Sequence, residues 1–471
     1  MPTDDVYEDT YLSFWPRVRR YAVPPSMIET ATARRGAGDW AGACAAAGVD
    51  PGFRPRTVAG THGRETAARV NADLRRLAPD LLRWHMPRIA PHGVLRPGVT
   101  VALARYEGAA RDGTGPLYLV ARTPPAWADA GQRIGLDLWD ASRTRAGTER
   151  HPHPRPGPRF RLDLHRHLWD ADRSAELAVR SGALASPGTD GDPRLLDPLG
   201  LVPADDRLAV GRWAAEAESL LRAECRAPGA VAVRTGTRRL LLAPDPSGPP
   251  SDDPATRGGT WWRVTADTGG GGVAPAVLPD AATFTPPDLV LLRAGLVTAD
   301  QLHPLVAAAL GPRRQAGAPA GPSGPGERVR FVDCRGGLHR IGLVDGVLTP
   351  LDHDPAEIRR EELLLALGGP PLPCVGAVDD AYRSPEDLDD IRERLRHGDT
   401  AGALTAVEEL LGPDAALRPG ALRDALRTAV RRRIDHGLYR AGLAGDHPAP
   451  HTTPGPRART RRGARRSGPA R

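Results

Sequence analysis

The spacing of apolar residues changes from helical to strand-like within the first 170 residues. Between Thr61 and Arg83 apolar side chains recur every three or four positions, which is typical of one helix face. Pro87 ends this stretch, because proline lacks the amide hydrogen that a further helical turn needs. Apolar and polar residues then alternate, which predicts antiparallel strands with one solvated face. The predicted strands are Val99–Leu103, Leu117–Ala121, Ile134–Leu138 and Phe160–Leu168.

The middle of the chain predicts helices on either side of further strands. Apolar residues at helical spacing indicate a helix near residues 204–226. Thr298 and Gln301 form a capping box, which predicts that another helix begins there. Residues 312–327, rich in proline and glycine, have the composition of a flexible linker. The strands in this part are expected at residues 230–233, 240–243 and 261–265.

After the linker the sequence predicts a three-stranded meander. Gly336-Gly337 and Asp345-Gly346 are dipeptides that suit tight two-residue hairpin turns. The strands that these turns join are expected at residues 330–333, 338–344 and 347–351.

The C-terminal part returns to a helical pattern. Asp354 followed by Pro355 predicts a helix start, because aspartate caps helix amides and proline suits the first helical position. We therefore expect an α+β protein in which helical N- and C-terminal regions flank antiparallel sheet units, with a disordered arginine-rich tail. The expected divisions are a mainly helical region at 1–92, an antiparallel β unit at 93–170, a mixed helix and strand region at 171–311, the linker at 312–327, a β-meander at 328–351, a helical region at 352–443 and a disordered basic tail at 444–471.

One short motif occurs twice. Residues 38–44 (GDWAGAC) and 398–404 (GDTAGAL) are identical at five of seven positions. Glycine followed by aspartate ends one helix and caps the next, and the small residues let two helices approach closely. The motif predicts two helical hairpins of tetratricopeptide type. Two interpretations stay open: related peptide-binding modules, or convergence on the same turn in an alanine-rich chain.

Composition excludes several catalytic classes. The chain contains no lysine, so all 64 basic residues are arginines. This excludes a phosphate-binding loop of the G-x-x-x-x-G-K-[ST] type, the kinase strand lysine and lysine Schiff-base chemistry. The motifs H-E-x-x-H and G-x-S-x-G are absent as well. No cofactor is expected.

The positive charge is concentrated at the C-terminal end of the sequence. The net charge is +7, and residues 457–471 contain seven arginines and no acid. Without those seven, 57 basic residues remain against 57 acidic ones, so the folded body lacks the excess expected of a nucleic-acid-binding fold. The tail either contacts nucleic acid or an acidic partner, or it reflects GC-rich coding. Its candidate binding residues include Arg461, Arg462, Arg465 and Arg466.

The cysteines and the N-terminal residues indicate a cytoplasmic protein. The four cysteines form no C-x-x-C pair, which argues against a zinc ribbon, a thioredoxin motif or a disulfide scaffold. The first residues are acidic and polar and lack the apolar stretch of a secretory signal. No apolar run approaches the roughly 18 residues of a membrane span, so no membrane association is expected.

The sharpest candidate for catalysis is Cys334 with His339. A loop formed by Gly336 and Gly337 alone would place Cys334 directly opposite His339, and Asp333 opposite Arg340. A thiol beside an imidazole can form an ion pair with a lowered thiol pKa, as a nucleophile needs. The alternative is that both side chains pack in a half-buried sheet without any chemistry.

A weaker candidate is a metal site in the last strand of the first sheet. In a strand, Asp163, His165 and His167 would project from one face, and such a set can ligate a metal. The same face also carries Arg159 and Arg161, which favours an ordinary solvated surface. We therefore expect no metal from this pattern.

Trp261 and Trp262 are the remaining candidate binding residues, since tryptophan is enriched at binding surfaces. The simpler interpretation is that they cover the end of a sheet. Taken together, the sequence favours a non-catalytic cytoplasmic interaction or scaffold component with a protein partner. The alternatives are an enzyme that uses Cys334 and His339, and a nucleic-acid-associated protein that acts through residues 457–471.

Overall fold

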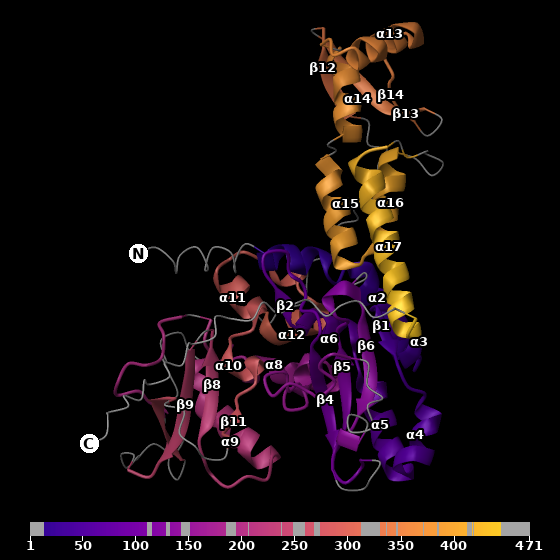
Figure 1. The fold of residues 1–471 in the computed structure, drawn as a ribbon. Coiled ribbons are helices and arrows are strands. Elements are labelled where there is room, and N and C mark those ends of the chain that lie inside the picture. Colours follow the sequence, from indigo (N-terminus) through magenta and orange to yellow (C-terminus); the bar gives the residue numbers. More distant parts are fainter. Residues whose placement is uncertain are drawn as a thin grey trace, which may run out of the picture.

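The computed structural model confirms an α+β fold with helical regions before and after antiparallel-rich sheet units (Figure 1). The predicted linker and the basic tail, with Arg461, Arg462, Arg465 and Arg466, lie outside the described residues. Those described residues are 14–443 except 111–114, 129–131, 143–150, 185–194, 206, 237, 248–259, 268–273, 312–329, 336, 345–346, 371, 384–385, 412–416 and 418.

The N-terminal region consists of short helices. Residues 14–21 are helical, and the predicted helix from Thr61 to Arg83 is divided into three. One break is at Gly63, whose φ of 85° is readily adopted only by glycine. The other falls at residues 77–78, just before a proline that begins the next helix. The helices are α2 (Pro25–Gly36), α3 (Trp40–Ala46), α4 (Pro55–His62), α5 (Arg64–Arg76) and α6 (Pro79–His85).

The first sheet has the strand order β1-β6-β5-β4. Three of its strands are the ones predicted by alternation, and β1 joins β6 in parallel. The strands are β1 (Val49–Pro51), β4 (Thr100–Tyr106), β5 (Leu117–Arg122) and β6 (Ile134–Trp139). A separate two-stranded ribbon consists of β2 (Arg88–Ile89) and β3 (Val94–Leu95).

The fourth predicted strand, Phe160–Leu168, is not a strand. Only Arg161 forms a bridge to β4, and the chain then turns into the 3-10 helix η2 (Arg166–Leu168). The alternation was misleading because the polar positions do not face solvent: Asp163 pairs with Arg161, and His165 lies 3.2 Å from Glu216. Polar side chains with buried partners carry no signal for a strand with one solvated face.

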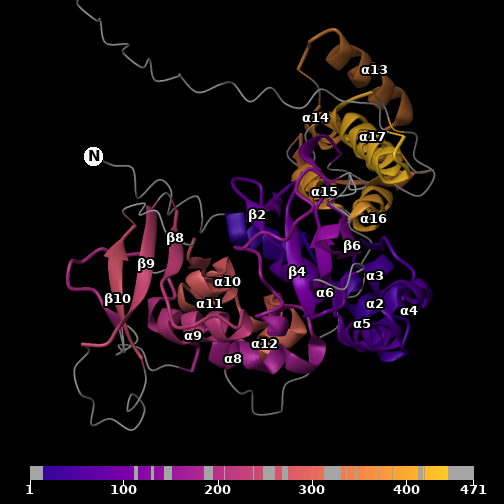
Figure 2. The same cartoon turned by 60° about the horizontal axis from the view of Figure 1, so that its bottom comes forward.

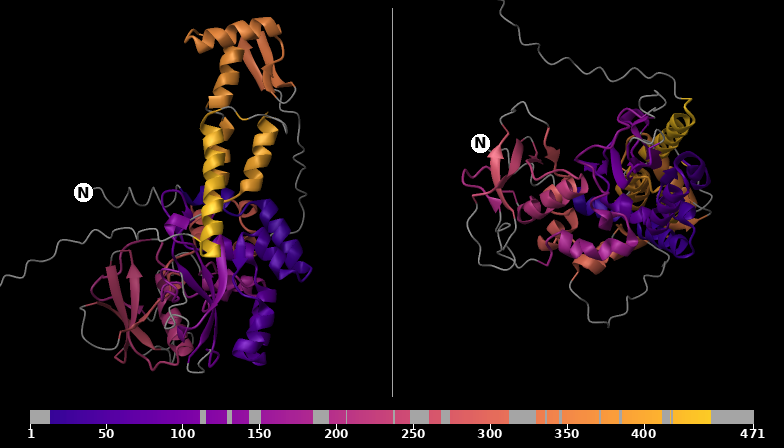
Figure 3. Two further views of the ribbon diagram at one scale, coloured as in Figure 1. Left: turned by 45° about the vertical axis from the view of Figure 1, so that its right-hand side comes forward. Right: turned by 90° about the horizontal axis from the view of Figure 1, so that it is seen from below.

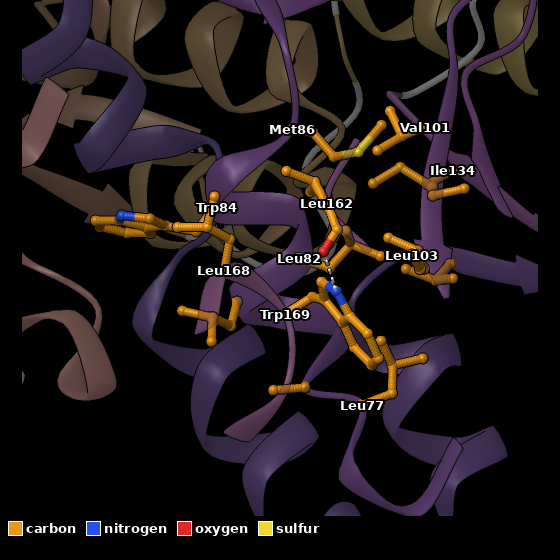
Figure 4. Close-up of a cluster of buried hydrophobic side chains, with 14 of the residues drawn as sticks. Leu77, Leu82, Trp84, Met86, Val101, Leu103, Ile134, Leu162, Leu168 and Trp169 are labelled. Carbon is orange, nitrogen blue, oxygen red and sulfur yellow. Dashed lines mark hydrogen bonds between the residues drawn. The ribbon is translucent and has the colours of Figure 1, made fainter. Parts of the chain in front are cut away.

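A large apolar core lies between the N-terminal helices and the first sheet. Tryptophan and leucine side chains from α6, β4 and the η2 segment meet there (Figure 4). Trp169, fully buried, donates its Nε1 hydrogen to the carbonyl oxygen of Leu162 at 3.0 Å, so its one polar atom is satisfied.

The second sheet has the strand order β11-β8-β9-β10-β7 and packs its apolar face on α9 (Trp213–Ala223). Helices α8–α12 lie between the two sheets in Figure 2. The strands are β7 (Leu195–Leu196), β8 (Val231–Thr235), β9 (Arg238–Asp245), β10 (Trp261–Ala266) and β11 (Ala276–Val277). The helices are α8 (Leu177–Arg180), α10 (Asp280–Thr283), α11 (Pro287–Arg293) and α12 (Pro304–Leu310), with the 3-10 turns η1 (Ala126–Ala128), η3 (Ala171–Glu176), η4 (Val210–Arg212) and η5 (Ala299–Gln301).

The predicted capping box at Thr298 and Gln301 is present, but it opens the short η5 rather than α12. A proline begins α12 separately, three residues after η5 ends.

The third sheet is the predicted meander, in the order β12-β13-β14. Its strands are β12 (Arg330–Cys334), β13 (Gly337–Val344) and β14 (Val347–Pro350). With two helices it forms a small unit that lies at the far end of the C-terminal helices from the rest of the molecule (Figure 3). The helices of this region are α13 (Pro355–Ala366), α14 (Pro373–Arg383), α15 (Glu386–His397), α16 (Thr400–Leu411) and α17 (Ala421–Ala441).

The two copies of the repeated motif form the same helical hairpin. Gly38 and Gly398 have φ values of 75° and 86°, and each is followed by an aspartate that caps the second helix. Oδ1 of Asp39 accepts from the Gly42 amide at 2.8 Å, and Oδ1 of Asp399 accepts from the Gly402 amide at 2.9 Å. An arginine five residues earlier pairs with each aspartate, at 3.3 and 3.2 Å.

The C-terminal helices contact the N-terminal body through buried polar groups. Nη2 of Arg83 donates to the carbonyl oxygen of His397 at 2.7 Å, and the Tyr21 hydroxyl donates to Asp390 at 2.8 Å. The ring of Trp127 lies 5.4 Å from that of Tyr439, centroid to centroid. Within the described part of the chain, no helix is long and apolar enough to cross a membrane.

Candidate metal centre

The turn between β12 and β13 differs from the prediction. Cys334 lies opposite Gly337, and His339 lies opposite Val332. The loop therefore begins one residue early, at Arg335, whose φ of 55° is unusual for a residue with a side chain. The predicted direct pairing of Cys334 with His339 is wrong, and so is that of Asp333 with Arg340.

The altered register still leaves Cys334 and His339 on one face of the sheet. The register moved by two positions, and side chains alternate with a period of two, so both keep their side as diagonal neighbours. Arg340 is on the opposite face and pairs with Asp352 at 2.7 Å. The predicted register is therefore wrong, but the prediction that Cys334 and His339 share one face of the sheet is correct.

Two further residues complete a cluster of four donors. His353 lies in the turn between β14 and α13, and Cys374 lies in the first turn of α14. One ligand atom from each of Cys334, His339, His353 and Cys374 lies within 4.8 Å of the other three. Among the described residues this is the group of histidine, cysteine and acidic side chains close enough to hold a metal ion.

Two of the donor separations can be compared with those around a tetrahedral zinc ion. Sγ of Cys334 lies 3.6 Å from Nε2 of His353, and Nδ1 of His339 lies 2.8 Å from the same nitrogen. Zinc bonds of about 2.3 Å to sulfur and about 2.0 Å to nitrogen give donor separations of about 3.3–3.8 Å around a tetrahedron. The sulfur–nitrogen distance already has this value, and the two imidazoles need to separate by only about 0.5 Å.

A carboxylate orients one of the imidazoles. Nδ1 of His353 lies 3.3 Å from Oε2 of Glu357, so Nε2 is the nitrogen that faces the cluster. Glu357 also pairs with Arg335, at 2.8 Å, and its hydrogen bond to His353 together with that arginine lowers the pKa of the carboxyl. Histidine ligands of metals usually donate their second ring nitrogen to such a carboxylate, which fixes the tautomer.

The two thiols are buried. Cys334 and Cys374 are fully inaccessible and pack with Ile358, Leu372 and Val375 in a small apolar cluster. Burial and the neighbouring Cys334 thiol raise the pKa of Cys374 to about 12. Since thiolate is the form that ligates metals, binding of an ion here releases protons.

His353 and Cys374 were not predicted as site residues from the sequence. The four donors follow the spacing C-x4-H-x13-H-x20-C, which contains no close pair of the kind found in zinc ribbons. The available signal was indirect: His353 stands immediately before the helix cap Asp354, at the end of the meander that carries the other two donors.

The second predicted metal candidate does not form a site. Asp163 is held by a bidentate ion pair with Arg161, at 2.8 Å for both bonds. His165 lies 3.2 Å from Glu216, and His167 is buried beside it. The predicted solvated face is therefore wrong: these polar side chains belong to a buried ion-pair network that joins η2 to α9.

Of the two candidate binding tryptophans, only Trp261 is partly exposed. Trp262 is buried in the core of the second sheet, and its Nε1 lies 3.5 Å from Glu218. Trp261, on the other side of the strand, is half-buried. Burial of Trp262 removes one of the two proposed contact residues.

Comparisons with known proteins give no relative: no family model, no curated protein and no solved structure matches this chain.

Proposed function

We propose that the protein is a non-catalytic cytoplasmic interaction or scaffold component in which residues 330–383 form a small module organised by one zinc ion. The observation that carries this proposal is the cluster of Cys334, His339, His353 and Cys374. Two thiols and two imidazoles are a donor set that zinc prefers.

The donor set supports a structural rather than a catalytic role. Structural zinc sites use four protein ligands, whereas catalytic sites keep one position open for water or substrate. Here four side chains are available for four positions. Cys334 and His339, the residues of the enzyme hypothesis, would both be ligands and would not serve as nucleophile and base.

The size of the module gives a reason for the metal. Its apolar cluster consists of Cys334, Ile358, Leu372, Cys374 and Val375, with Val332 and Leu365 at its edge. So small a core supplies little burial, and small domains commonly add a structural metal for this reason. Zinc bound by the folded form alone would contribute its binding free energy to folding.

Cytoplasmic residence is part of the proposal. All four cysteines are free, and Cys44, Cys334 and Cys374 are buried. Free thiols persist in the reducing cytosol, whereas cysteines of extracellular proteins tend to form disulfide bonds. The arginines of residues 457–471 would then be an accessory contact for an acidic protein partner or nucleic acid.

The test is metal analysis of the full-length protein by mass spectrometry after purification without chelators. We expect about one zinc per chain in the wild type and in Cys225→Ser, whose cysteine is exposed and remote from the cluster. Cys374→Ser should lose most of the zinc. A folded wild-type protein that contains no zinc and takes none up would overturn the proposal.

A further inference from the structure

Helix α17 exposes an apolar row along one side. Its other side packs on α15 through Leu422, and its C-terminal end contacts the N-terminal body through His436, 3.4 Å from Asp50. Between these contacts, Val430 and Ile434 are 59% and 56% exposed. Both exceed the exposure normal for side chains that support a core, so they contribute little to the fold itself.

A row of arginines runs beside the apolar row. Leu426, Val430 and Ile434 are spaced four residues apart, and so are the arginines at 423, 427 and 431. Residues four apart lie on the same helix face, so the two rows are parallel. Together with Leu417 they line an open groove of about 540 Å³, here called the α17 groove.

The arginines of the groove form a basic row that makes no close ion pair within the described part of the chain. Within the described residues, neither Arg423, Arg427 nor Arg431 makes an ion pair. Arginine is enriched at protein interfaces, and an unpaired basic row beside exposed apolar residues is complementary to an acidic amphipathic surface.

We propose that the α17 groove binds an amphipathic helix of a partner protein, with apolar residues at helical spacing facing Val430 and Ile434 and acidic residues facing Arg427 and Arg431. This names the partner class for the interaction component proposed above and rests on that function. Docking of an apolar helix face into a groove, with charges at its edge, is a recurring mode of peptide recognition.

Other occupants fit less well. A second copy in a two-fold interface would bring the same arginine rows together, which repel. Residues 457–471 carry seven arginines and are repelled in the same way. Nucleic acid would pair with the arginines but would gain nothing from Val430 and Ile434, whose burial requires an apolar partner.

The test uses two synthetic helical peptides, both with leucines at helical spacing, one with flanking glutamates and one with lysines in their place. A short duplex DNA is the third probe. Binding is measured by fluorescence anisotropy on the full-length protein and on three variants. These are Arg427→Glu/Arg431→Glu, Val430→Ser/Ile434→Ser and the matched control Arg432→Glu/Arg433→Glu, which makes the same charge change outside the groove.

We expect the acidic peptide to bind the wild type and the control. Each of the two groove variants should weaken it by about tenfold or more, the usual effect of losing central interface residues. The variant Arg427→Glu/Arg431→Glu, whose groove charge is reversed, should instead bind the lysine peptide.

The inference is overturned by absence of acidic-peptide binding, by equal binding to the control and groove variants, or by binding of DNA in place of peptide. Self-association that Val430→Ser/Ile434→Ser abolishes overturns it as well. Binding that occurs only after Asp4, Asp5, Glu8 and Asp9 are neutralised would assign the groove to the chain's own acidic N-terminal residues. Zinc content measured in parallel separates the two proposals. A protein that contains zinc but does not bind the acidic peptide refutes the proposal for the α17 groove and leaves the zinc module standing.

Discussion

His353 and Glu357 lie one helical turn apart, and Nδ1 of His353 is 3.3 Å from Oε2 of Glu357. This contact turns the other ring nitrogen toward Cys334, at 3.6 Å. The carboxylate therefore positions a ligand without being one itself.

Glu357→Gln should weaken zinc binding without abolishing it. Removing the carboxylate charge makes the imidazole a poorer ligand, and such substitutions typically cost about 10–100-fold in metal affinity. The affinity is measured by competition with a chromophoric chelator. Glu362→Gln, an exposed position on the same helix, should leave the affinity unchanged. Equal affinities for both variants would show that Glu357 does not orient the ligand.

Removal of zinc should unfold the meander module and leave the first sheet intact. The module has its own small apolar cluster, separate from the large core around β4–β6. Hydrogen exchange after treatment with a chelator should therefore show lost protection in β12–β14 and unchanged protection in β4–β6. Protection of β12–β14 that survives chelation would mean that the metal does not support the fold.

The helix caps formed by Asp39 and Asp399 should contribute similarly to the free energy of unfolding. Asp39→Ala and Asp399→Ala each remove a hydrogen bond to a helix amide, which costs about 0.5–2 kcal/mol. Urea unfolding gives the two free energies. Asp389→Ala is the control, since this exposed aspartate forms a surface ion pair and no cap. A value for Asp399→Ala no larger than that of the control would contradict the shared geometry.

Arg83 should be among the most costly positions to replace. Its guanidinium is buried, and it donates to the carbonyl oxygens of Ala22, Gln132 and His397. Arg83→Met leaves these acceptors without their donor, and each unsatisfied buried group costs about 1–3 kcal/mol. Limited proteolysis should show earlier cleavage within α15–α17, because one of the lost bonds holds the end of α15. Arg76→Met, on the surface, should behave as the wild type.

Stability should fall as the pH drops below about 6.5. Burial and the positive charges of Arg88 and Arg83 lower the pKa of His397 to about 2. As the pH falls through about 6.5, His397 therefore binds a proton in the unfolded chain but not in the folded chain. The contribution of neutral His397 to the free energy of unfolding is complete above that pH and declines below it. The slope is at most about 1.4 kcal/mol per pH unit for this site.

His397→Gln should remove one proton from that dependence, as seen by urea unfolding at pH 7 and pH 5. The slope will not vanish, because burial also lowers the pKa of His85 and of His167 well below the usual range. His92→Gln, an exposed position, should keep the wild-type slope. A His397→Gln protein with the unchanged slope would show that His397 titrates normally.

The sequence predicted the elements that depend on local pattern. Alternation located β4, β5 and β6, and the glycine–aspartate motif located both hairpins. The sequence pattern failed where contacts between distant parts of the chain determine burial. By spacing, Asp163 and His165 fit the solvated face of a strand. In the structure Asp163 pairs with Arg161, and His165 lies against Glu216 of α9. Cys374 could not be assigned to the cluster because its position depends on how α14 packs on the meander, which no local spacing encodes.

X-ray absorption at the zinc edge of the purified full-length protein decides whether the two cysteines and two histidines hold a zinc ion. We expect a four-coordinate ion with two sulfur neighbours at about 2.3 Å and two nitrogen neighbours at about 2.0 Å. Loss of most of the zinc signal in Cys374→Ser, with an unchanged spectrum in Cys225→Ser, would assign Cys374 as a ligand. A spectrum without sulfur neighbours, or a folded protein that holds no metal, would contradict a zinc site at this cluster.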